Sequence, residues 1–259
     1  MYKEKLMYVV EENFKIAKDN FYISKEGNKV ELDTKVKDMI DKTEVVSNEV
    51  TYVNNYKDIQ NNYVVRDNII NTGTIDAILK LRSEGVIGNI IALNFASAIN
   101  PGGGYLMGSK AQEESLCRAS MLYESLKKQN DFYEFNRENY TPLYNDRMLY
   151  VPDVPIIRND NLELLNNYEL ASFIVSPAVN KRKAYAEGIR DEKLIVDIMG
   201  KRIEKIVKLA ISKNPTALIL GAFGCGVFGN DREVVYDIFE KYIRKLMPIE
   251  IKVIFAVIP

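Results

Sequence analysis

A glutamine and two glutamates, Gln112, Glu113 and Glu114, follow the glycine triplet Gly102 to Gly104 in the segment NPGGGYLMGSKAQEES. Carboxyl groups act as general acids and bases where a fold adjusts their proton affinity. Side chains of adjacent residues in a helix diverge by about 100°, so these two glutamates cannot form one symmetric pair. We therefore expect one glutamate to hold a substrate and the other to transfer protons.

The position of the two glutamates argues for a function. Acidic residues in the first turn of a helix also have a purely structural use, because they stabilise the helix dipole by a few tenths of a kcal/mol up to about 1 kcal/mol. Here, however, the predicted helix follows directly on a glycine-rich loop of the kind that binds phosphate. A bound anion makes further negative charge unfavourable, so two carboxylates beside it need a functional reason.

Two glycine-rich loops, Gly102 to Gly108 and Gly221 to Gly229, each follow a predicted buried strand and precede a predicted helix. In open α/β sheets, ligands bind beyond the carboxyl ends of the strands, where backbone N–H groups at a helix N-terminus suit phosphate oxygens. Glycines also serve simply as residues of tight turns. Two such loops together nevertheless indicate a site for two phosphates, or for a diphosphate and a sugar.

Familiar nucleotide-binding motifs do not account for these loops. The segment GGYLMGSK has Ser109 where a P-loop requires lysine. The segment GCGVFG, Gly224 to Gly229, matches G-x-G-x-x-G, but the strand predicted next, 251–258, has no acidic residue to bind a ribose. We interpret the second segment as a phosphate loop outside a Rossmann fold.

The elements that must position these loops alternate between strand and helix from about Thr43 onward. Predicted helices cover 72–85, beginning at a threonine cap, and 111–128, 191–214 and 231–246. Predicted strands cover 43–53, 89–98, 148–151, 171–179, 216–223 and 251–258, and the rest of 130–161 is expected to be irregular. Because 89–98 is apolar almost throughout, it is expected to be buried on both faces of a sheet. The pattern predicts an α/β domain with helices on both sides of a mixed sheet.

The first 43 residues have a different pattern. Apolar residues recur at helical spacing between Leu6 and Ala17, and two short strands are predicted about a turn at Glu26 to Asn28, followed by a short helix in 33–43. We predict an accessory N-terminal extension at 1–43, helical with a hairpin, packed on a main domain at 44–259.

Composition excludes several classes of function. The 35 basic residues of the 259-residue chain nearly balance its 36 acidic ones, so we expect no general nucleic-acid binding and no membrane contact. Histidine is absent, which excludes Ser-His-Asp and Cys-His catalysis and histidine-containing zinc sites. Cys117 and Cys225 lack metal-ligand spacing and are expected to be reduced thiols. We expect a soluble, cytoplasmic, monomeric protein that uses no metal and no cofactor.

Four motifs occur in a fixed order: LNFASAINPGGGYLMGSKAQEESLCR at 93–118, LYESL at 122–126, SPAVN at 176–180 and LILGAFGCGVFGND at 218–231. Together they resemble the microbial type of poly(ADP-ribose) glycohydrolase, a branch of the macrodomain fold. The resemblance runs from about Val45 to the end of the sequence, and the N-terminal extension is similar to that of the family. It implies a three-layer α/β/α macrodomain that hydrolyses the ribose–ribose bonds of poly(ADP-ribose) and releases ADP-ribose.

The resemblance also implies a role for each matching position. Glu114 would be the catalytic acid and base, and Glu113 would hydrogen-bond the ribose hydroxyls of the terminal unit. Adenine would be contacted somewhere in 68–75. Two departures from the family are Phe223, where the family has tryptophan, and Val179, where it often has proline. The distal ribose would be lined by Gly102, Gly103 and Gly104, in a loop oriented by Asn100 and Gln112. The diphosphate would be bound by Gly224, Cys225, Gly226 and Val227. Phe228 would pack on the distal ribose.

Two other functions remain as alternatives. The chain could be a non-catalytic reader that binds ADP-ribose without turning it over, although such a protein would not need Glu114. It could also be a hydrolase of a different ADP-ribose linkage, to a protein side chain, a nucleic-acid base or a small nucleotide. The expected partner is therefore ADP-ribose, its polymer or an ADP-ribosylated target.

Overall fold

The centre of the molecule is a sheet whose middle strand, β5 (Ile90–Phe95), is buried along nearly its whole length. The computed structural model describes residues 2–47, 50 and 58–258. Within these residues the sheet has seven strands, in the order β3 (Glu44–Val46), β6 (Met148–Arg158), β7 (Leu164–Ser176), β5, β8 (Ala217–Leu220), β9 (Lys252–Ala256) and β4 (Ile69–Ile70). The strands from β7 to β4 are parallel, whereas β6 is antiparallel to both β7 and β3. The predicted mixed sheet is confirmed.

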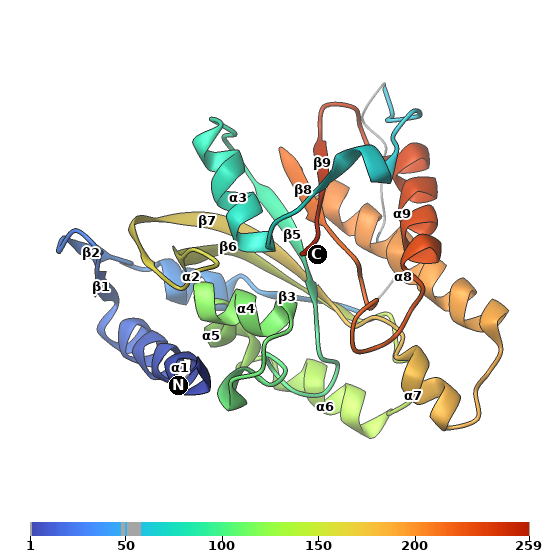
Figure 1. Cartoon of the computed structure of the whole chain (residues 1–259), viewed down its shortest axis with the longest axis horizontal. Coiled ribbons are helices and arrows are strands. Elements are labelled where there is room, and N and C mark those ends of the chain that lie inside the picture. The colour runs from blue at the N-terminus through green and yellow to red at the C-terminus, as the bar shows by residue number, and fades with distance from the viewer. Residues whose placement is uncertain (1, 48–49, 51–57, 259) are drawn as a thin grey trace.

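Helices cover both faces of this sheet, as Figure 1 shows. One apolar cluster joins the sheet to α3 (Thr74–Ser83), α4 (Gln112–Ala119) and α5 (Leu122–Leu126), and a second joins the other face to α8 (Glu192–Ser212) and α9 (Arg232–Leu246). The predicted three-layer α/β/α arrangement is therefore confirmed. None of the described helices combines the length and the apolar character that crossing a membrane requires.

The chain between 130 and 161 is more regular than predicted. Its first part forms α6 (Asn130–Glu138), and its last part forms β6, an eleven-residue strand that pairs with β7. The strand was not predicted at its full length because it contains Pro152 and Pro155, and proline lacks the N–H that a ladder hydrogen bond needs. The register shifts between Val151 and Val154, and the residue between Pro152 and Val154, Asp153, has a φ of +49°. A bulge at this point accommodates the first proline.

The predicted helix at 111–128 is in fact two helices, α4 and α5. Ser120 between them is extended and forms an isolated bridge with Ile156, while Met121 donates its N–H to the carbonyl of Pro155 at 2.9 Å. The Ser120 hydroxyl donates to the Leu116 carbonyl and accepts from the Leu122 N–H. Pairing with β6 and this hydroxyl together interrupt the helix.

The start of α3 also differs from the prediction, since no threonine caps it. Its N-cap is Gly73, and the Asp76 N–H instead donates to Asp160, from the turn between β6 and β7, at 3.1 Å. A Cβ on Gly73 would lie 2.1 Å from an oxygen of Asp160, so only glycine lets that carboxylate approach. The capping group therefore comes from a distant part of the chain that local sequence could not reveal.

Residues before β3 form the predicted helix and hairpin. They are α1 (Tyr2–Asp19), the pair β1 (Phe21–Ile23) and β2 (Lys29–Glu31), and α2 (Lys35–Asp41). Their apolar side chains belong to the same cluster as those of α3 and α4. Division of the chain at residue 43 stays a prediction. Of the strand predicted at 43–53, β3 is described, and residues 48–49 and 51–53 lie outside the described part.

Candidate active site

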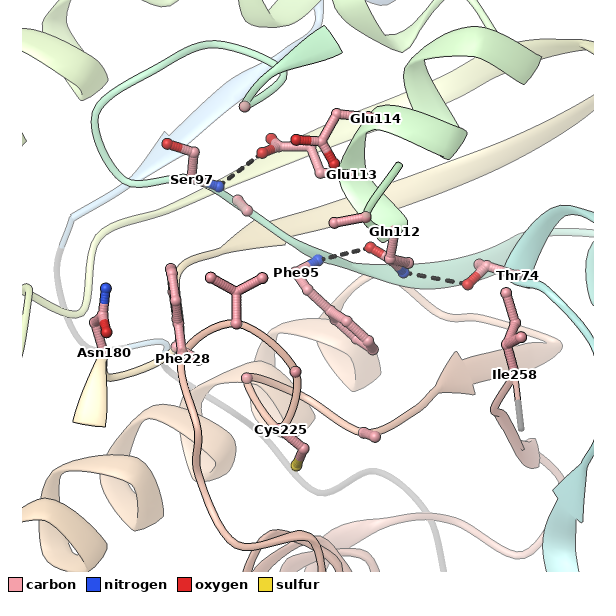
Figure 2. A pocket seen from close by; sticks show the side chains of 18 of the residues that line it. Thr74, Phe95, Ser97, Gln112, Glu113, Glu114, Asn180, Cys225, Phe228 and Ile258 are labelled. Atoms are coloured by element: carbon pink, nitrogen blue, oxygen red, sulfur yellow. Dashed lines mark hydrogen bonds between the residues drawn. The ribbon is translucent and has the colours of Figure 1, made fainter. Parts of the chain in front are cut away.

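A cavity of about 610 Å³ opens beyond the carboxyl ends of β5, β8 and β9. This volume is within the range of about 300–1,000 Å³ that small-molecule sites occupy. Figure 2 shows Glu113 and Glu114 on one side of the cavity, Phe228 and Asn180 at one end, and Thr74 and Ile258 at the other. Both glycine-rich loops contribute to its wall, as the position of the loops in the sequence predicts.

Gln112 ties the start of α4 to the sheet. Its side-chain oxygen accepts from the Phe95 N–H at 2.9 Å, and its side-chain nitrogen donates to the Leu93 carbonyl at 2.8 Å and to the Thr74 hydroxyl at 3.1 Å. These hydrogen bonds go to β5 and α3, and the predicted role of Gln112 in orienting the glycine loop stays a prediction. By fixing the helix start, Gln112 positions the two glutamates that follow it.

Glu113 lies in a buried, hydrogen-bonded position, with 3% of the residue exposed. One carboxyl oxygen accepts from the Ser97 N–H at 2.7 Å and the other from the Asn94 side chain at 3.3 Å. Burial raises the pKa of Glu113 to about 8, the two hydrogen bonds oppose this shift, and nearby Glu114 adds to it. At neutral pH the Glu113 carboxyl is therefore mostly protonated.

Glu114 has a different environment from its neighbour. One carboxyl oxygen, Oε1, accepts from the Gly104 N–H at 2.8 Å. The other, Oε2, is buried and has no hydrogen-bond partner among the residues that the structure describes. Both glutamates line the cavity, and the anchored oxygen fixes the Glu114 side chain there while Oε2 is not used in a hydrogen bond to the described residues.

Only one glycine of the triplet, Gly103, lines the cavity. A Cβ on Gly103 would lie 2.6 Å from Oε1 of Glu114 and 3.0 Å from Oε2 of Glu113, and its φ is +58°. Gly102 and Gly104 do not line the cavity, which corrects the expectation for them. A Cβ on Gly102 would meet the ring of Tyr123 at 2.8 Å, and Gly104 supplies the N–H that holds Glu114. These two glycines shape the loop from behind.

Asn100, the first predicted residue of this loop, does line the cavity. Its carbonyl accepts from the Gly103 N–H at 2.9 Å, and its N–H donates to the Ser97 hydroxyl at 3.1 Å. The backbone of Asn100 thus closes the turn that presents Gly103. Its predicted role in orienting the loop agrees with these contacts.

The second loop lies between β8 and α9, and five of its residues line the cavity together with Phe228. Asn230 holds the loop closed, because its side-chain nitrogen donates to the Val179 carbonyl at 2.8 Å and to the Gly224 carbonyl at 3.0 Å. The N–H groups of residues 226–228 donate to no group in the described part of the chain. They are free to bind an anion. The five residues are Ala222 and the predicted Gly224, Cys225, Gly226 and Val227.

Aromatic and polar side chains beyond Phe228 extend the wall, and the sequence interpretation missed them. Tyr140, Tyr144, Asn180 and Lys183 all line the cavity. They follow α6 or lie at the start of α7 (Lys181–Ala186), far in sequence from either glycine loop. The richness of 130–145 in aromatic residues was the local signal for Tyr140 and Tyr144, and Asn180 is the last residue of the SPAVN motif.

At the opposite end the wall is formed by two segments. Residues 72–74, within the predicted adenine region 68–75, line the cavity, and so do residues 256–258 after β9. No local pattern pointed to the second segment. The two lie together because β4 and β9 are paired neighbours in the sheet.

The two departures from the family motifs lie behind the cavity. Phe223 is fully buried, with its ring 5.8 Å from that of Phe95, and Val179 is fully buried as well. Both cysteines are free, as predicted. Burial raises the pKa of Cys225 to about 11, so this thiol is neutral in the cavity wall. The described residues contain no group of three or more Cys, Asp or Glu side chains that could hold a metal ion.

Comparison with known proteins gives a consistent result. Residues 10–159 match the family model "Microbial-type PARG, catalytic domain", in which PARG stands for poly(ADP-ribose) glycohydrolase. The chain is similar to the glycohydrolase of Thermomonospora curvata, with 28% identity, a TM-score of 0.82, and coverage of 98% of this chain and 93% of that one. The structure of that enzyme with the inhibitor ADP-HPD matches equally well. No curated protein matches the chain in sequence.

A second solved relative is the glycohydrolase of Deinococcus radiodurans in complex with ADP-ribose. It is 28% identical, with a TM-score of 0.74 and coverage of 86% of this chain and 90% of that one. Identity in the two relatives is thus similar, while the first covers more of the chain. The family match spans more than half of the sequence and includes the glycine triplet and both glutamates.

Proposed function

The chain belongs to the family of microbial-type poly(ADP-ribose) glycohydrolases, and we propose from this that it hydrolyses the ribose–ribose O-glycosidic bonds of poly(ADP-ribose). The products are ADP-ribose and a chain one unit shorter. The observation that carries the proposal is the Glu114 carboxyl group at the cavity, with Oε1 held by the Gly104 N–H and Oε2 unpartnered.

In the proposed reaction Glu114 acts first as acid and then as base. Its protonated Oε2 donates to the 2′-oxygen of the leaving ribose while the bond from that oxygen to C1″ breaks. Positive charge develops on the terminal ribose in an oxocarbenium-like state. The Glu114 carboxylate then takes a proton from the water that attacks C1″, which restores the acid and yields free ADP-ribose.

Glu113 holds the terminal ribose in this scheme. Its carboxyl group is fixed by Ser97 and Asn94, and its pKa of about 8 keeps it mostly neutral at pH 7. A neutral carboxyl can donate a hydrogen bond to a ribose hydroxyl. It also avoids a second full negative charge close to a diphosphate, which removes the electrostatic objection to two adjacent glutamates at such a site.

The two ends of the cavity fit the other parts of ADP-ribose. The free N–H groups of residues 226–228 suit the diphosphate oxygens, and Phe228 forms the wall where the distal ribose would lie. Residues 72–74 and 256–258, at the end shown by Thr74 and Ile258 in Figure 2, would receive the adenine. This order puts the C1″ atom of the terminal ribose near the two glutamates.

The proposal is tested by offering the protein a panel of substrates: poly(ADP-ribose), an ADP-ribosylated protein, an ADP-ribosylated nucleic-acid base and a small ADP-ribosylated nucleotide. Release of ADP-ribose from the polymer is the expected result. Binding of ADP-ribose with no release from any substrate would instead identify a reader, and release only from another linkage would identify a different hydrolase. Both outcomes would contradict the proposal.

A further inference from the structure

One part of the cavity wall has no task in the reaction described above. It comprises Tyr140, Tyr144 and Lys183, which we call the acceptor wall. The ammonium group of Lys183 lies 4.5 Å from the centre of the Tyr140 ring, and the rings of Tyr140 and Tyr144 meet edge to face at 6.3 Å. The wall therefore presents two aromatic rings and a cation on one continuous surface.

The acceptor wall adjoins the place where the bond is cleaved. The Tyr144 ring lies 6.1 Å from that of Phe228, the residue expected to pack on the distal ribose. On the other side, Arg137 of α6 donates to the Ile99 carbonyl at 2.8 Å, which ties the preceding helix to the loop that carries the glycine triplet. Asn180, next to Phe228 in Figure 2, marks this end of the cavity, opposite Thr74.

The segment that carries Tyr144 is held rigidly. Tyr144 has a φ of +53°, a left-handed conformation that costs a non-glycine residue about 1–3 kcal/mol. The fully buried guanidinium group of Arg202 donates to the carbonyl of Leu143 at 3.0 Å, to that of Pro177 at 3.0 Å and to the carboxylate of Asp146 at 2.9 Å. A strained residue fixed by a buried cation is typical of a preorganised binding surface.

The group that leaves in the reaction has chemistry that matches this wall. When a ribose–ribose bond of the polymer breaks, the leaving oxygen belongs to the adenosine of the next ADP-ribose unit, which carries an adenine and a diphosphate. Stacking of a base on an aromatic side chain contributes about 1–3 kcal/mol, and an ammonium group attracts phosphate as a point charge. The nearest carboxylate, Glu187, lies 3.9 Å from the Lys183 ammonium, and half of the Lys183 side chain is exposed.

We propose that Tyr140, Tyr144 and Lys183 form a subsite for the leaving ADP-ribose unit, in which the tyrosines contact its adenine and Lys183 its phosphate. This inference rests on the proposed function, because it takes the leaving group to be a second ADP-ribose unit. The subsite makes the polymer a better ligand than ADP-ribose alone and selects against small leaving groups.

The test is a binding measurement in the Glu114→Gln protein, which cannot turn the ligand over. Two ligands are compared by calorimetry: free ADP-ribose and the dimer of two ADP-ribose units joined by a ribose–ribose bond. We expect the dimer to bind at least ~10-fold more tightly, as one stacked base allows. Adding Tyr140→Leu and Lys183→Met should remove this preference while the affinity for ADP-ribose stays the same.

A matched control is Lys181→Met, because Lys181 is on the same helix but lies outside the cavity and pairs with Glu192 at 2.8 Å. It should keep the preference for the dimer. Equal affinities for the two ligands in the Glu114→Gln protein would overturn the subsite, and so would a preference that survives in the double variant. Failure of the proposed function is a separate result, namely no release of ADP-ribose from the polymer by the wild-type protein.

Discussion

At the scale of single residues, Glu113 and Glu114 are neighbours in sequence but have different environments. Glu113 uses both oxygens to accept hydrogen bonds from Ser97 and Asn94, whereas Glu114 keeps one oxygen free. The divergence of adjacent side chains on a helix makes this possible. The same divergence predicts a division of roles between the two glutamates, and their two environments are consistent with it.

Stability should depend on pH through Glu113. Its pKa is raised from 4.5 to about 8 in the folded protein, so the folded state binds more protons than the unfolded state between these values. The free energy of unfolding therefore falls as pH rises through this window, by an amount on the order of a few kcal/mol. In Glu113→Gln this decline should be absent, so the variant gains stability relative to wild type between pH 5 and 8.5, measured by urea denaturation.

Asp160→Asn is the matched control for that experiment. Burial raises the pKa of Asp160 from 3.8 to about 6, so the decline in the free energy of unfolding that Asp160 causes should occur between these lower pH values and be complete near neutrality. If the stability curves of wild type and Glu113→Gln run parallel up to pH 8.5, then Glu113 is ionised in the free protein. The neutral role assigned to it would then be wrong.

Gly103→Ala should disable the site without unfolding the protein. The added methyl group would lie 2.6 Å from Oε1 of Glu114, so the carboxyl must move, and a displacement of about 1 Å can lower kcat/KM by ~10²-fold. Gly27→Ala is the control, because Gly27 also has a positive φ, of +84°, but its Cβ would meet nothing within 4 Å. Equal effects of the two substitutions on kcat/KM for the polymer would show that only backbone strain matters.

At the scale of elements, the site depends on two loops at the ends of β5 and β8, which lie side by side in the sheet. Asn230 fixes the second loop through its bonds to Val179 and Gly224. Asn230→Ala would leave the Val179 carbonyl without a donor, at a cost of about 1–3 kcal/mol, whereas the Gly224 carbonyl would keep its bond from the backbone N–H of residue 230. We expect a lower Tm. We also expect ~10-fold weaker binding of ADP-ribose, because a displaced loop would lose about one charge-assisted hydrogen bond to the diphosphate.

Asn139→Ala is the control for Asn230→Ala, since within the described part of the chain the exposed Asn139 side chain bonds only to the Phe135 carbonyl of the adjoining helix α6. It should change neither Tm nor affinity. Unchanged calorimetric affinity for ADP-ribose in Asn230→Ala would contradict the role given to the second loop. The loop would then keep its conformation without this side chain.

Elements that local sequence decides were predicted, and elements that depend on distant segments were not. Long amphipathic helices such as α8 and apolar strands such as β5 were predicted because their patterns are local. The break at Ser120 and the long strand β6 were not, because pairing between distant segments decides them. For the same reason the glycine loops and glutamates were found from sequence, whereas Tyr140, Lys183 and residues 256–258 reach the cavity only through the fold.

At the scale of the whole molecule, the N-terminal residues support the site by holding α4, the helix that carries the two glutamates. Asn13 of α1 donates to the carbonyls of Cys117 and Arg118 near the end of α4, at 3.2 and 2.9 Å. The buried guanidinium group of Arg158 bonds to Glu12 and Asn13. We propose that residues 1–43 are an integral part of the folded unit.

Removal of residues 1–43 should therefore abolish cooperative unfolding. It would expose apolar residues of the cluster that the N-terminal segment shares with α3 and α4. It would also remove Glu12, the carboxylate that pairs with the buried Arg158. Loss of one partner of a buried ion pair typically costs about 3–5 kcal/mol, or about half the stability of a domain. The milder change Asn13→Ala should lower the free energy of unfolding by about 1–3 kcal/mol. A truncated chain that unfolds cooperatively and hydrolyses the polymer at the wild-type rate would refute this proposal.

The central claim is that Glu114 transfers the proton, and a comparison of Glu114→Gln with wild type tests it most directly. Glutamine keeps an oxygen for the Gly104 N–H but cannot donate and accept a proton as a carboxyl does. We expect release of ADP-ribose from poly(ADP-ribose) to slow by ~10²–10⁴-fold while ADP-ribose binds as before. Glu124→Gln, whose parent carboxylate pairs with Lys127, should behave as wild type. Release at the wild-type rate by Glu114→Gln would show that Glu114 does not transfer the proton.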